Sequence, residues 1–349
     1  MDALDVVVIG GGQAALAAGY YLRRSTKTLR ILDAEAGPGG AWRHTWPSLR
    51  LFSPARWSSL PGWLMPPTQD RYPTRDEALA YLADYERRLS LPVERPVRVT
   101  QVWADGARLR LVTSDGRELS AGAVVSATGT WTSPQLPQFP GQASFSGQIL
   151  HSAQYAGPAA FAGRRVLVIG AGNSGAQIFA DLVDHADATW VTHAPPVFLP
   201  DDVDGQVLFE QATERYKAIK EGRTPPPPRS LGDIVMVESV RALRDRGLLA
   251  AEPIFARFTP TGVEWPGGRR RDIDAVVFAT GFRPALTHLA PLVTVDERGR
   301  LPMNGVRAAA HPQLFPLGYG DWTGFASATL VGVGRSAKAV ADAITGSTA

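Results

Sequence analysis

Two short glycine-rich turns have the spacing of backbone loops that cradle phosphate groups. The first turn combines Gly10 and Gly12 with Ala15, and the second combines Gly170, Gly172 and Gly175. In such a turn the first glycine permits a tight bend, the second lets the backbone approach a pyrophosphate, and a small third residue lets helix and strand pack closely. The N-terminus of the next helix faces the phosphate charge. The turns therefore predict two dinucleotide sites, which could bring a hydride donor to an acceptor.

Each turn lies between the elements that such a site requires. Apolar β-branched runs at residues 6–9 and 165–169 predict strands before the turns, and alanine-rich stretches at 13–24 and 173–183 predict helices after them. A further strand is predicted after each helix, at residues 29–32 and 189–192. Glycines also mark ordinary turns, but this repeated strand–turn–helix–strand context favours two βαβ units and an α/β fold.

The residues that end these later strands distinguish the two sites. Asp33 ends the first strand, where a carboxylate can accept hydrogen bonds from a ribose diol; the alternative is a solvated charge at a strand end. Thr192 and His193 end the second strand, without the carboxylate that favours NAD or the arginine that favours NADP. We therefore expect both NADH and NADPH to be used, with Thr192 and His193 near the adenosine ribose. His193 as a plain surface residue is the alternative.

The remaining segments are predicted from composition and periodicity. We expect mostly loop at 41–75, a helix at 77–89, a β-meander with turns at Asp105-Gly106 and Asp115-Gly116 in 97–125, a stiff four-proline spacer at 225–228, and a helix from Leu330 onward.

Composition excludes several classes of protein. The 349 residues include no cysteine, which excludes disulfide frameworks, thiolate metal sites and cysteine catalysis, and the six histidines have no metal-ligand spacing, so no metal is expected. A net charge of +3 without a basic block does not indicate a nucleic-acid partner. No apolar run reaches the length of a membrane span, and no signal peptide opens the chain, so we expect a cytoplasmic protein without a membrane partner.

Further motifs carry a resemblance to a known family. Residues 145–155 fit FxGxxxHxxxY, Gly39-Gly40-Ala41-Trp42 fits GGxW, residues 127–129 and 279–281 both read ATG, and residues 318–321 end in Gly-Asp. This set resembles the flavin-containing monooxygenases, in particular the small bacterial type II enzymes with relaxed NADH/NADPH use, within the class B flavoprotein monooxygenases. The resemblance implies two Rossmann-like dinucleotide-binding domains, the second inserted into the first. From the strand before the second turn and from the two ATG segments, we expect an FAD domain of residues 1–156 and 284–349 and an NAD(P) domain of residues 157–283.

The resemblance also implies the cofactor contacts. The residues expected along FAD are Gly10, Gly12, Gln13, Ala14, Asp33, Gly40, Trp42, Gly129 and Asp321. The residues expected along NADPH or NADH are Gly170, Gly172, Asn173, Ser174, Gly175, Thr192, His193, Thr280 and Gly281. The alternative role for Asp321 is a helix-capping carboxylate.

One position departs from the family pattern. Where related enzymes carry a flavin-adjacent asparagine in L-x-T-N-x-P, this chain has Phe52, whose ring cannot donate a hydrogen bond as an amide does. We expect an enzyme that loses more of its activated oxygen as peroxide. His151 and Tyr155 of the fingerprint are expected to shape the interdomain linker rather than perform chemistry. Six aromatic residues are expected either to wall a dry pocket or only to pack a loop: Trp42, Trp46, Phe52, Trp57, Trp63 and Tyr72.

The implied activity is an FAD-dependent, NAD(P)H-using monooxygenation. One oxygen atom of O₂ would pass through a C4a-(hydro)peroxyflavin to soft nucleophiles such as sulfides, with some Baeyer–Villiger oxidation of ketones. A small-molecule substrate and O₂ are the expected partners, and a homodimer stays open. Two alternatives remain: an NAD(P)H oxidase or reductase without oxygen transfer, and a non-catalytic FAD-binding redox sensor. A disulfide reductase is excluded because the chain has no cysteine.

Overall fold

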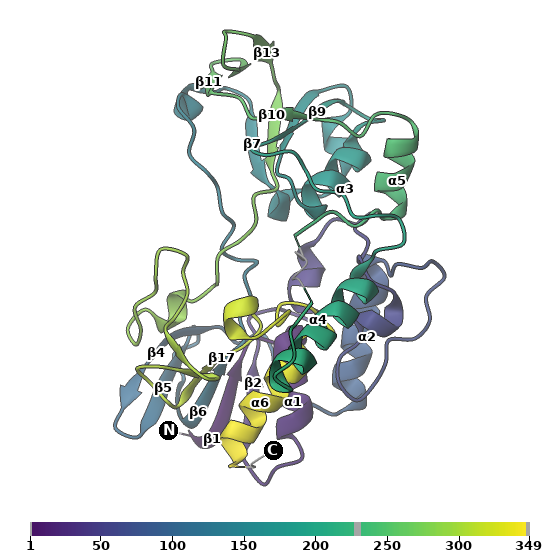
Figure 1. Ribbon diagram of the computed structural model, residues 1–349. Coiled ribbons are helices and arrows are strands. Elements are labelled where there is room, and N and C mark those ends of the chain that lie inside the picture. Colours follow the sequence, from purple (N-terminus) through teal and green to yellow (C-terminus); the bar gives the residue numbers. More distant parts are fainter. Residues whose placement is uncertain (1, 227–231, 347–349) are drawn as a thin grey trace.

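The first half of the molecule is built around one sheet with parallel and antiparallel strands (Figure 1). The computed structural model describes residues 2–226 and 232–346; the second half of the expected proline spacer, Pro227 and Pro228, lies outside them. Across the described strands the sheet order is β3 (Val93–Glu94), β2 (Leu29–Leu32), β1 (Asp2–Ile9), β6 (Glu118–Ser126), β5 (Arg108–Thr113) and β4 (Val99–Asp105), with β17 (Leu314–Pro316) also paired to β6. The strands β3, β2, β1, β6 and β17 are parallel, and β4–β6 form the predicted antiparallel meander.

Helices cover this sheet because their apolar faces need burial. Helix α1 (Gln13–Leu22) packs against α6 (Val333–Thr345), and both contribute to one core with the buried end of β1. Helix α2 (Arg75–Arg88) begins at a capping box, in which Thr74 Oγ1 accepts from the Glu77 amide while the Glu77 carboxylate accepts from the Thr74 amide. The helices predicted at 77–89 and from Leu330 are thus confirmed, with starts shifted by two or three residues.

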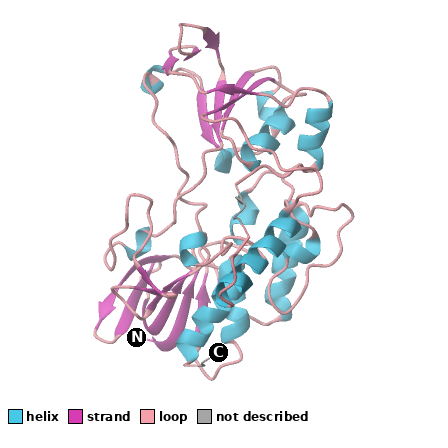
Figure 2. Ribbon diagram, viewed as in Figure 1, coloured by secondary structure: helices cyan, strands magenta, loops and turns pink. Residues whose placement is uncertain are grey.

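The second half has a parallel sheet of its own (Figure 2). Its described strands follow the order β10 (Ala251–Pro253), β9 (Asp187–Thr192), β8 (Arg165–Ile169), β14 (Ala275–Phe278) and β7 (Gln148–His151). Helices α3 (Asn173–Leu182) and α5 (Glu238–Asp245) pack beside it, and a small antiparallel sheet joins β11 (Arg257–Thr259), β12 (Gly262–Glu264) and β13 (Arg270–Asp272).

One helix and several short elements complete the two halves. Helix α4 (Gly205–Lys220) leaves the second half and contacts η2 of the first. The minor elements are β15 (Met303–Asn304), β16 (Arg307–Ala308) and the 3₁₀ turns η1 (Gly40–His44), η2 (Ala55–Ser58), η3 (Gln142–Ser144), η4 (Ser152–Gln154), η5 (Pro158–Phe161), η6 (Thr287–Leu289) and η7 (Asp321–Thr323). The mostly irregular segment at 41–75 agrees with the prediction.

The predicted α/β fold with one dinucleotide unit inserted into another is confirmed. After β14 the chain returns to the first sheet through β17 and α6, so both termini lie in the first half (Figure 1). The boundary expected after residue 156 needs correction, because β7 pairs with β14 in the second sheet. The sequence signal began only at the strand before the second turn, whereas this edge strand precedes it.

Candidate functional site

The first glycine of each turn is required by the fold itself. Gly10 has a φ of +106°, and a Cβ on it would lie 2.4 Å from the Ala127 carbonyl oxygen. Gly170 has a φ of +143°, and its Cβ would lie 2.2 Å from the Ala279 carbonyl oxygen. A side chain is excluded at both positions by backbone strain and by contact with the strand beside it. These glycines make the tight bends.

The second glycine of each turn is not required by the fold of the protein. Gly12 has an ordinary φ of −82° and Gly172 one of −105°. The nearest atom to an added Cβ is 3.7 Å away at Gly12 (Gly40 Cα) and 3.8 Å away at Gly172 (Gly232 carbonyl oxygen). Neither backbone conformation nor protein packing demands glycine here. A bare backbone at these points fits the close approach of a pyrophosphate, so the residues present fit two dinucleotides.

The helices behind both turns leave their N-termini open to an anion. Neither Gly12 at the start of α1 nor Gly172 at the start of α3 supplies a side-chain cap, whereas α2 has the Thr74 capping box. Amide groups at an uncapped helix N-terminus carry partial positive charge and need acceptors. Phosphate oxygens would satisfy both ends.

A cavity of about 720 Å³ begins at the first turn and extends to the second. Of the residues expected along FAD, eight line it: Gly10, Gly12, Gln13, Ala14, Asp33, Gly40, Trp42 and Gly129. From the NAD(P) set, Ser174 lines the same cavity. Most of the residues predicted along FAD therefore line one space, and Ser174 is the member of the NAD(P) set that reaches it.

Asp33 is held in place by a buried ion cluster. Asp33 is 4% exposed, and Arg95 Nε donates a hydrogen bond to Asp33 Oδ2 at 2.6 Å. The other guanidinium nitrogens of Arg95 donate to both Glu86 oxygens at 2.6 and 2.8 Å. The alternative of a solvated strand-end charge is wrong for Asp33. The pairing fixes the carboxylate orientation at the cavity wall, which suits recognition of a ribose diol.

Gln13 ties three separate motifs together. Trp42 Nε1 of the GGxW segment donates to Gln13 Oε1 at 3.1 Å, and Gln13 Nε2 donates to the Ala328 carbonyl oxygen at 2.7 Å. The first turn, η1 and the C-terminal segment are thereby fixed relative to one another. Asp321, in contrast, is exposed at the start of η7, outside the residues that line the cavity. Its carboxylate accepts at 3.3 Å from the Ala326 amide, which agrees with the alternative of a local capping role.

A buried polar network that sequence reasoning missed supports the first ATG motif. Tyr319 OH lies 2.6 Å from Ser126 Oγ and 2.7 Å from Thr128 Oγ1, and Ser126 Oγ lies 3.1 Å from His288 Nε2. His288 lines the cavity and is 7% exposed, and burial lowers its pKa from 6.5 to about 4. The ring is therefore neutral at physiological pH. No sequence motif marked His288, because its partners are distant along the chain.

Several residues expected along NAD(P)H form hydrogen bonds or packing contacts within the protein instead. Asn173 donates to the Asp233 carbonyl oxygen and accepts from the Val235 amide, so its side chain holds the 233–235 segment. Thr280 Oγ1 donates to the Gln135 carbonyl oxygen at 2.5 Å. Thr192 is buried at the end of β9, and the His193 ring is exposed and stacks on Phe139 at 6.3 Å. The space around Gly172 and the helix end at Ser174 are thus the parts of this set that stay open.

The predicted linker role fits His151, which bonds to the second ATG segment, whereas Tyr155 bonds to α3 within the second half. His151 Nδ1 accepts from the Ala153 amide, so its Nε2–H donates to the Gly281 carbonyl oxygen at 3.0 Å. Burial lowers the pKa of His151, which keeps this pattern of donor and acceptor. Tyr155 OH donates to Asp181 Oδ2 at 2.7 Å. Both side chains are 1% exposed.

The structure places Phe52 away from the cavity lining. Its ring packs on the second core and lies 6.2 Å from the Phe209 ring of α4. Trp46 and Leu49 of the same segment line the cavity instead. The Phe52 carbonyl oxygen accepts a hydrogen bond from the Gly205 amide of α4, which holds this irregular segment against α4. The flavin-adjacent position that the resemblance implied for Phe52 stays a prediction.

The aromatic residues divide between the two expected roles. Trp42 and Trp46 line the cavity together with Trp131 and Phe282, whose rings stack at 5.2 Å. Trp63 instead packs on Tyr81 of α2, so it belongs to the core of the first half.

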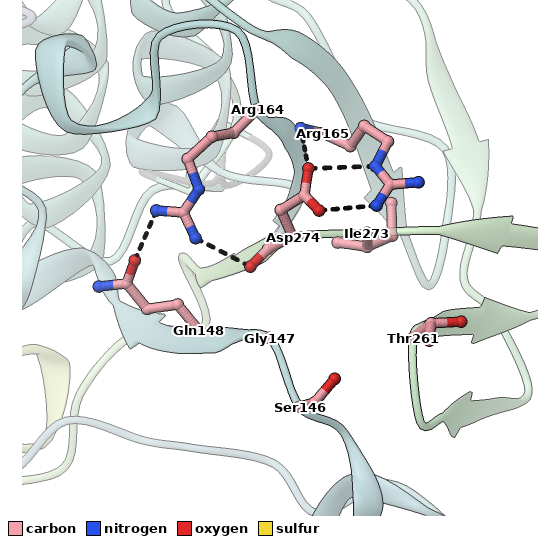
Figure 3. Close-up of a pocket in the computed structure, with 8 residues that line it drawn as sticks. All are labelled: Ser146, Gly147, Gln148, Arg164, Arg165, Thr261, Ile273 and Asp274. Atoms are coloured by element: carbon pink, nitrogen blue, oxygen red, sulfur yellow. Dashed lines mark hydrogen bonds and ion pairs between the residues drawn. The ribbon is translucent and has the colours of Figure 1, made fainter.

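A second hollow, of about 640 Å³, lies at the amino ends of β8 and β14 (Figure 3). Two arginines face it, but their donors are engaged: Arg165 forms a paired contact with the Asp274 carboxylate, and Arg164 donates to Gln148 and to the Asp274 carbonyl oxygen (Figure 3). The Arg165 guanidinium lowers the pKa of Asp274 well below its ordinary value. These charges stabilise a strand edge.

The described residues hold neither a candidate metal cluster nor a candidate membrane-spanning helix. Among residues 2–226 and 232–346, no group of three or more His, Asp or Glu side chains could hold a metal ion. Within the same ranges, no helix combines the length and apolarity needed to cross a bilayer.

Comparisons with known proteins define the class. A model of the pyridine nucleotide-disulphide oxidoreductase family matches residues 7–216, and the chain belongs to this family. A flavin-containing monooxygenase structure from Stenotrophomonas maltophilia is 53% identical, with 99% of each chain covered and a TM-score of 0.91. An uncharacterized CzcO-like oxidoreductase of Geobacillus kaustophilus is 29% identical over 342 residues, 96% of each chain. Indole-3-pyruvate monooxygenase YUCCA4 of Oryza sativa is 27% identical over 367 residues, which covers 91% of this chain and 83% of that one.

Within the family, the chain is a flavin-containing monooxygenase of the class B flavoprotein type, an NAD(P)H-dependent oxidoreductase that uses FAD. The family name includes disulphide chemistry, which this cysteine-free chain cannot perform.

Proposed function

We propose that this enzyme transfers one oxygen atom from O₂ to soft nucleophiles such as sulfides, with Baeyer–Villiger oxidation of some ketones as a second activity. The observation that carries the proposal is one cavity that is lined by the first phosphate-cradling turn and reached by Ser174 of the second. The 53% sequence identity between this chain and a flavin-containing monooxygenase supports an oxygen-transfer reaction. Bound FAD supplies the redox chemistry, because it accepts hydride from NAD(P)H and reacts with O₂.

The chain's own residues bind and orient the cofactors. We assign the pyrophosphate of FAD to the backbone at Gly12 and the start of α1, and the adenosine ribose of FAD to Asp33, which Arg95 orients. The backbone at Gly172 and the start of α3 would hold the pyrophosphate of NAD(P)H. The NAD(P) residues inferred from the family pattern are part of this proposal.

We assign the exclusion of water from the cavity to the aromatic side chains that line it. Trp42, Trp46, Trp131 and Phe282 line the cavity between the turns and present apolar surface to it. A dry site suppresses loss of activated oxygen as peroxide. Coenzyme choice stays relaxed in this proposal, because Thr192 and His193 supply neither an NAD-selective carboxylate nor an NADP-selective guanidinium.

Anaerobic and aerobic measurements on one preparation test the proposal. Purified protein should be yellow, and its flavin absorbance should bleach when NADH or NADPH is added without oxygen. In air, a thioether should yield sulfoxide in proportion to the coenzyme consumed, with peroxide as the remainder. Bleaching with all electrons recovered as peroxide, and no sulfoxide from any sulfide, would favour a plain NAD(P)H oxidase. Absence of bleaching would favour a non-catalytic FAD-binding sensor.

A further inference from the structure

Residues 46–51, the wall segment, belong to the first half and contribute to the lining of the cavity. Trp46 and Leu49 of this segment line the cavity. The backbone at 49–51 forms hydrogen bonds along one edge to residues 73–75, which precede and begin α2. The first half therefore holds one edge of the wall segment, and the position of its other edge depends on different partners.

A glutamine side chain from the second half pairs with this other edge. Gln177 Oε1 of α3 accepts from the Arg50 amide at 3.1 Å, and Gln177 Nε2 donates to the Arg50 carbonyl oxygen at 3.3 Å. Gln177 is 6% exposed, and its amide offers both the donor and the acceptor that one residue of a strand needs. An apolar side chain of equal length would remove both partners from the Arg50 backbone. The contact therefore fixes the wall segment to α3 across 127 positions of sequence.

The face of α3 that carries Gln177 also reaches the second cradle. Ser174, Gln177 and Asp181 lie at positions i, i+3 and i+7 of this helix, which share one face. Ser174 lines the cavity, and Asp181 accepts from Tyr155 OH at 2.7 Å. The Tyr155 ring lies edge-on to the Trp46 ring at 6.0 Å, so this face holds the wall segment at a second point. Two turns of helix thus connect the wall segment to the open N-terminus of α3.

We propose that Gln177 is a positioning residue that couples occupancy of the second turn by the coenzyme to the position of the wall segment. This inference rests on the proposed function, because it takes the pyrophosphate of NAD(P)H to bind at Gly172 and the start of α3. A coenzyme bound there restrains the N-terminus of α3, and the Gln177 amide passes this restraint to the Arg50 backbone. The wall segment is then held most firmly while the coenzyme is bound, which limits the entry of water into the cavity.

Hydrogen exchange of single amides in the oxidised, FAD-loaded protein tests the coupling without turnover. Exchange of a protected amide reports how often its surroundings open. In wild type, saturating NADP⁺ should slow exchange of the Arg50 amide roughly 2- to 10-fold, the range of one neutral hydrogen bond. The Leu111 amide of β5, which lies outside the cavity lining, is the reference and should not change.

A variant distinguishes coupling through Gln177 from direct contact with the coenzyme. Gln177→Met keeps an unbranched side chain and removes both hydrogen bonds. Exchange of the Arg50 amide should become roughly 2- to 10-fold faster than in wild type, and NADP⁺ should no longer slow it although the flavin spectrum still reports NADP⁺ binding. Gln206→Met is the matched control, because the Gln206 amide donates to Glu210 within α4; it should behave as wild type. A purely structural role would speed exchange and leave the effect of NADP⁺ intact.

Two results would overturn the coupling. One is equal exchange of the Arg50 amide in wild type with and without NADP⁺, a measurement that needs no variant. The other is the same slowing by NADP⁺ in Gln177→Met as in wild type. If Gln177→Met does not fold, Gln177→Leu is measured in its place, since it also lacks both hydrogen-bonding groups. The proposed function fails separately, if wild-type flavin is not bleached by NAD(P)H.

Discussion

Replacement of His288 by glutamine should remove an acid sensitivity that the fold imposes. His288 lies under the first ATG motif, and its Nε2 is 3.1 Å from Ser126 Oγ. A glutamine amide nitrogen can occupy a similar position and cannot take up a proton in this pH range. The substitution therefore keeps a polar partner for Ser126 and removes only the titration.

The magnitude follows from the shift in the pKa of His288, from 6.5 to about 4. Between these values the unfolded chain binds a proton that the folded protein does not, so the free energy of unfolding falls as the pH decreases. The loss begins near the unfolded pKa and is complete near the folded pKa, where it amounts to about 3 kcal/mol. Most of it, about 2 kcal/mol, is expected by pH 5.

Urea unfolding at pH 7 and pH 5, with the same excess of FAD, measures this effect. Other groups also titrate in this range, so the informative quantity is the difference between the pH dependences of two proteins. His288→Gln should lose about 2 kcal/mol less than wild type between the two pH values. His185→Gln is the control, because His185 is exposed, and should follow wild type.

Parallel pH dependences for wild type and His288→Gln would refute the reasoning. Such a result would mean that the folded protein takes up the proton at His288 as readily as the unfolded chain. Burial behind Ser126 and Tyr319 would then not exclude charge from this part of the cavity wall.

Three further predictions concern the two cradles. Arg95→Met should leave the buried Asp33 and the half-buried Glu86 without their shared counter-ion and cost roughly 3–5 kcal/mol, measured as lower thermal stability and weaker FAD retention. A stable, fully loaded variant would contradict this role of Arg95. Gly172→Ala should leave the melting temperature unchanged, since its φ is ordinary and its Cβ meets nothing closer than 3.8 Å, yet weaken NADP⁺ binding by about tenfold or more, or 1.4 kcal/mol. Equal binding would argue against a pyrophosphate there. Steady-state kcat/KM for NADH and NADPH should agree within about 100-fold, because His193 and its neighbours select neither coenzyme.

The sequence by itself determined the two dinucleotide units. Gly10 and Gly170 could be recognised because a left-handed bend beside a strand accepts only glycine, and that requirement is local. The strands and helices around these glycines could be predicted as well, because hydrophobic periodicity is also a local property of the sequence. The meander at 97–125 was likewise readable from alternating residues and turn residues. The linker role of His151 came from the family fingerprint instead, because its partner Gly281 is distant along the chain.

Only the tertiary structure decided which side chains face the cavity. Trp46 and Phe52 lie six positions apart in one irregular segment, and packing against α4 turns Phe52 away while Trp46 lines the wall. The Asn173 amide has the right place in the motif for a ligand contact but is used by the 233–235 segment. His288 finds Ser126 across 162 positions of sequence. Such contacts depend on how two sheets pack together, and no local propensity encodes that arrangement.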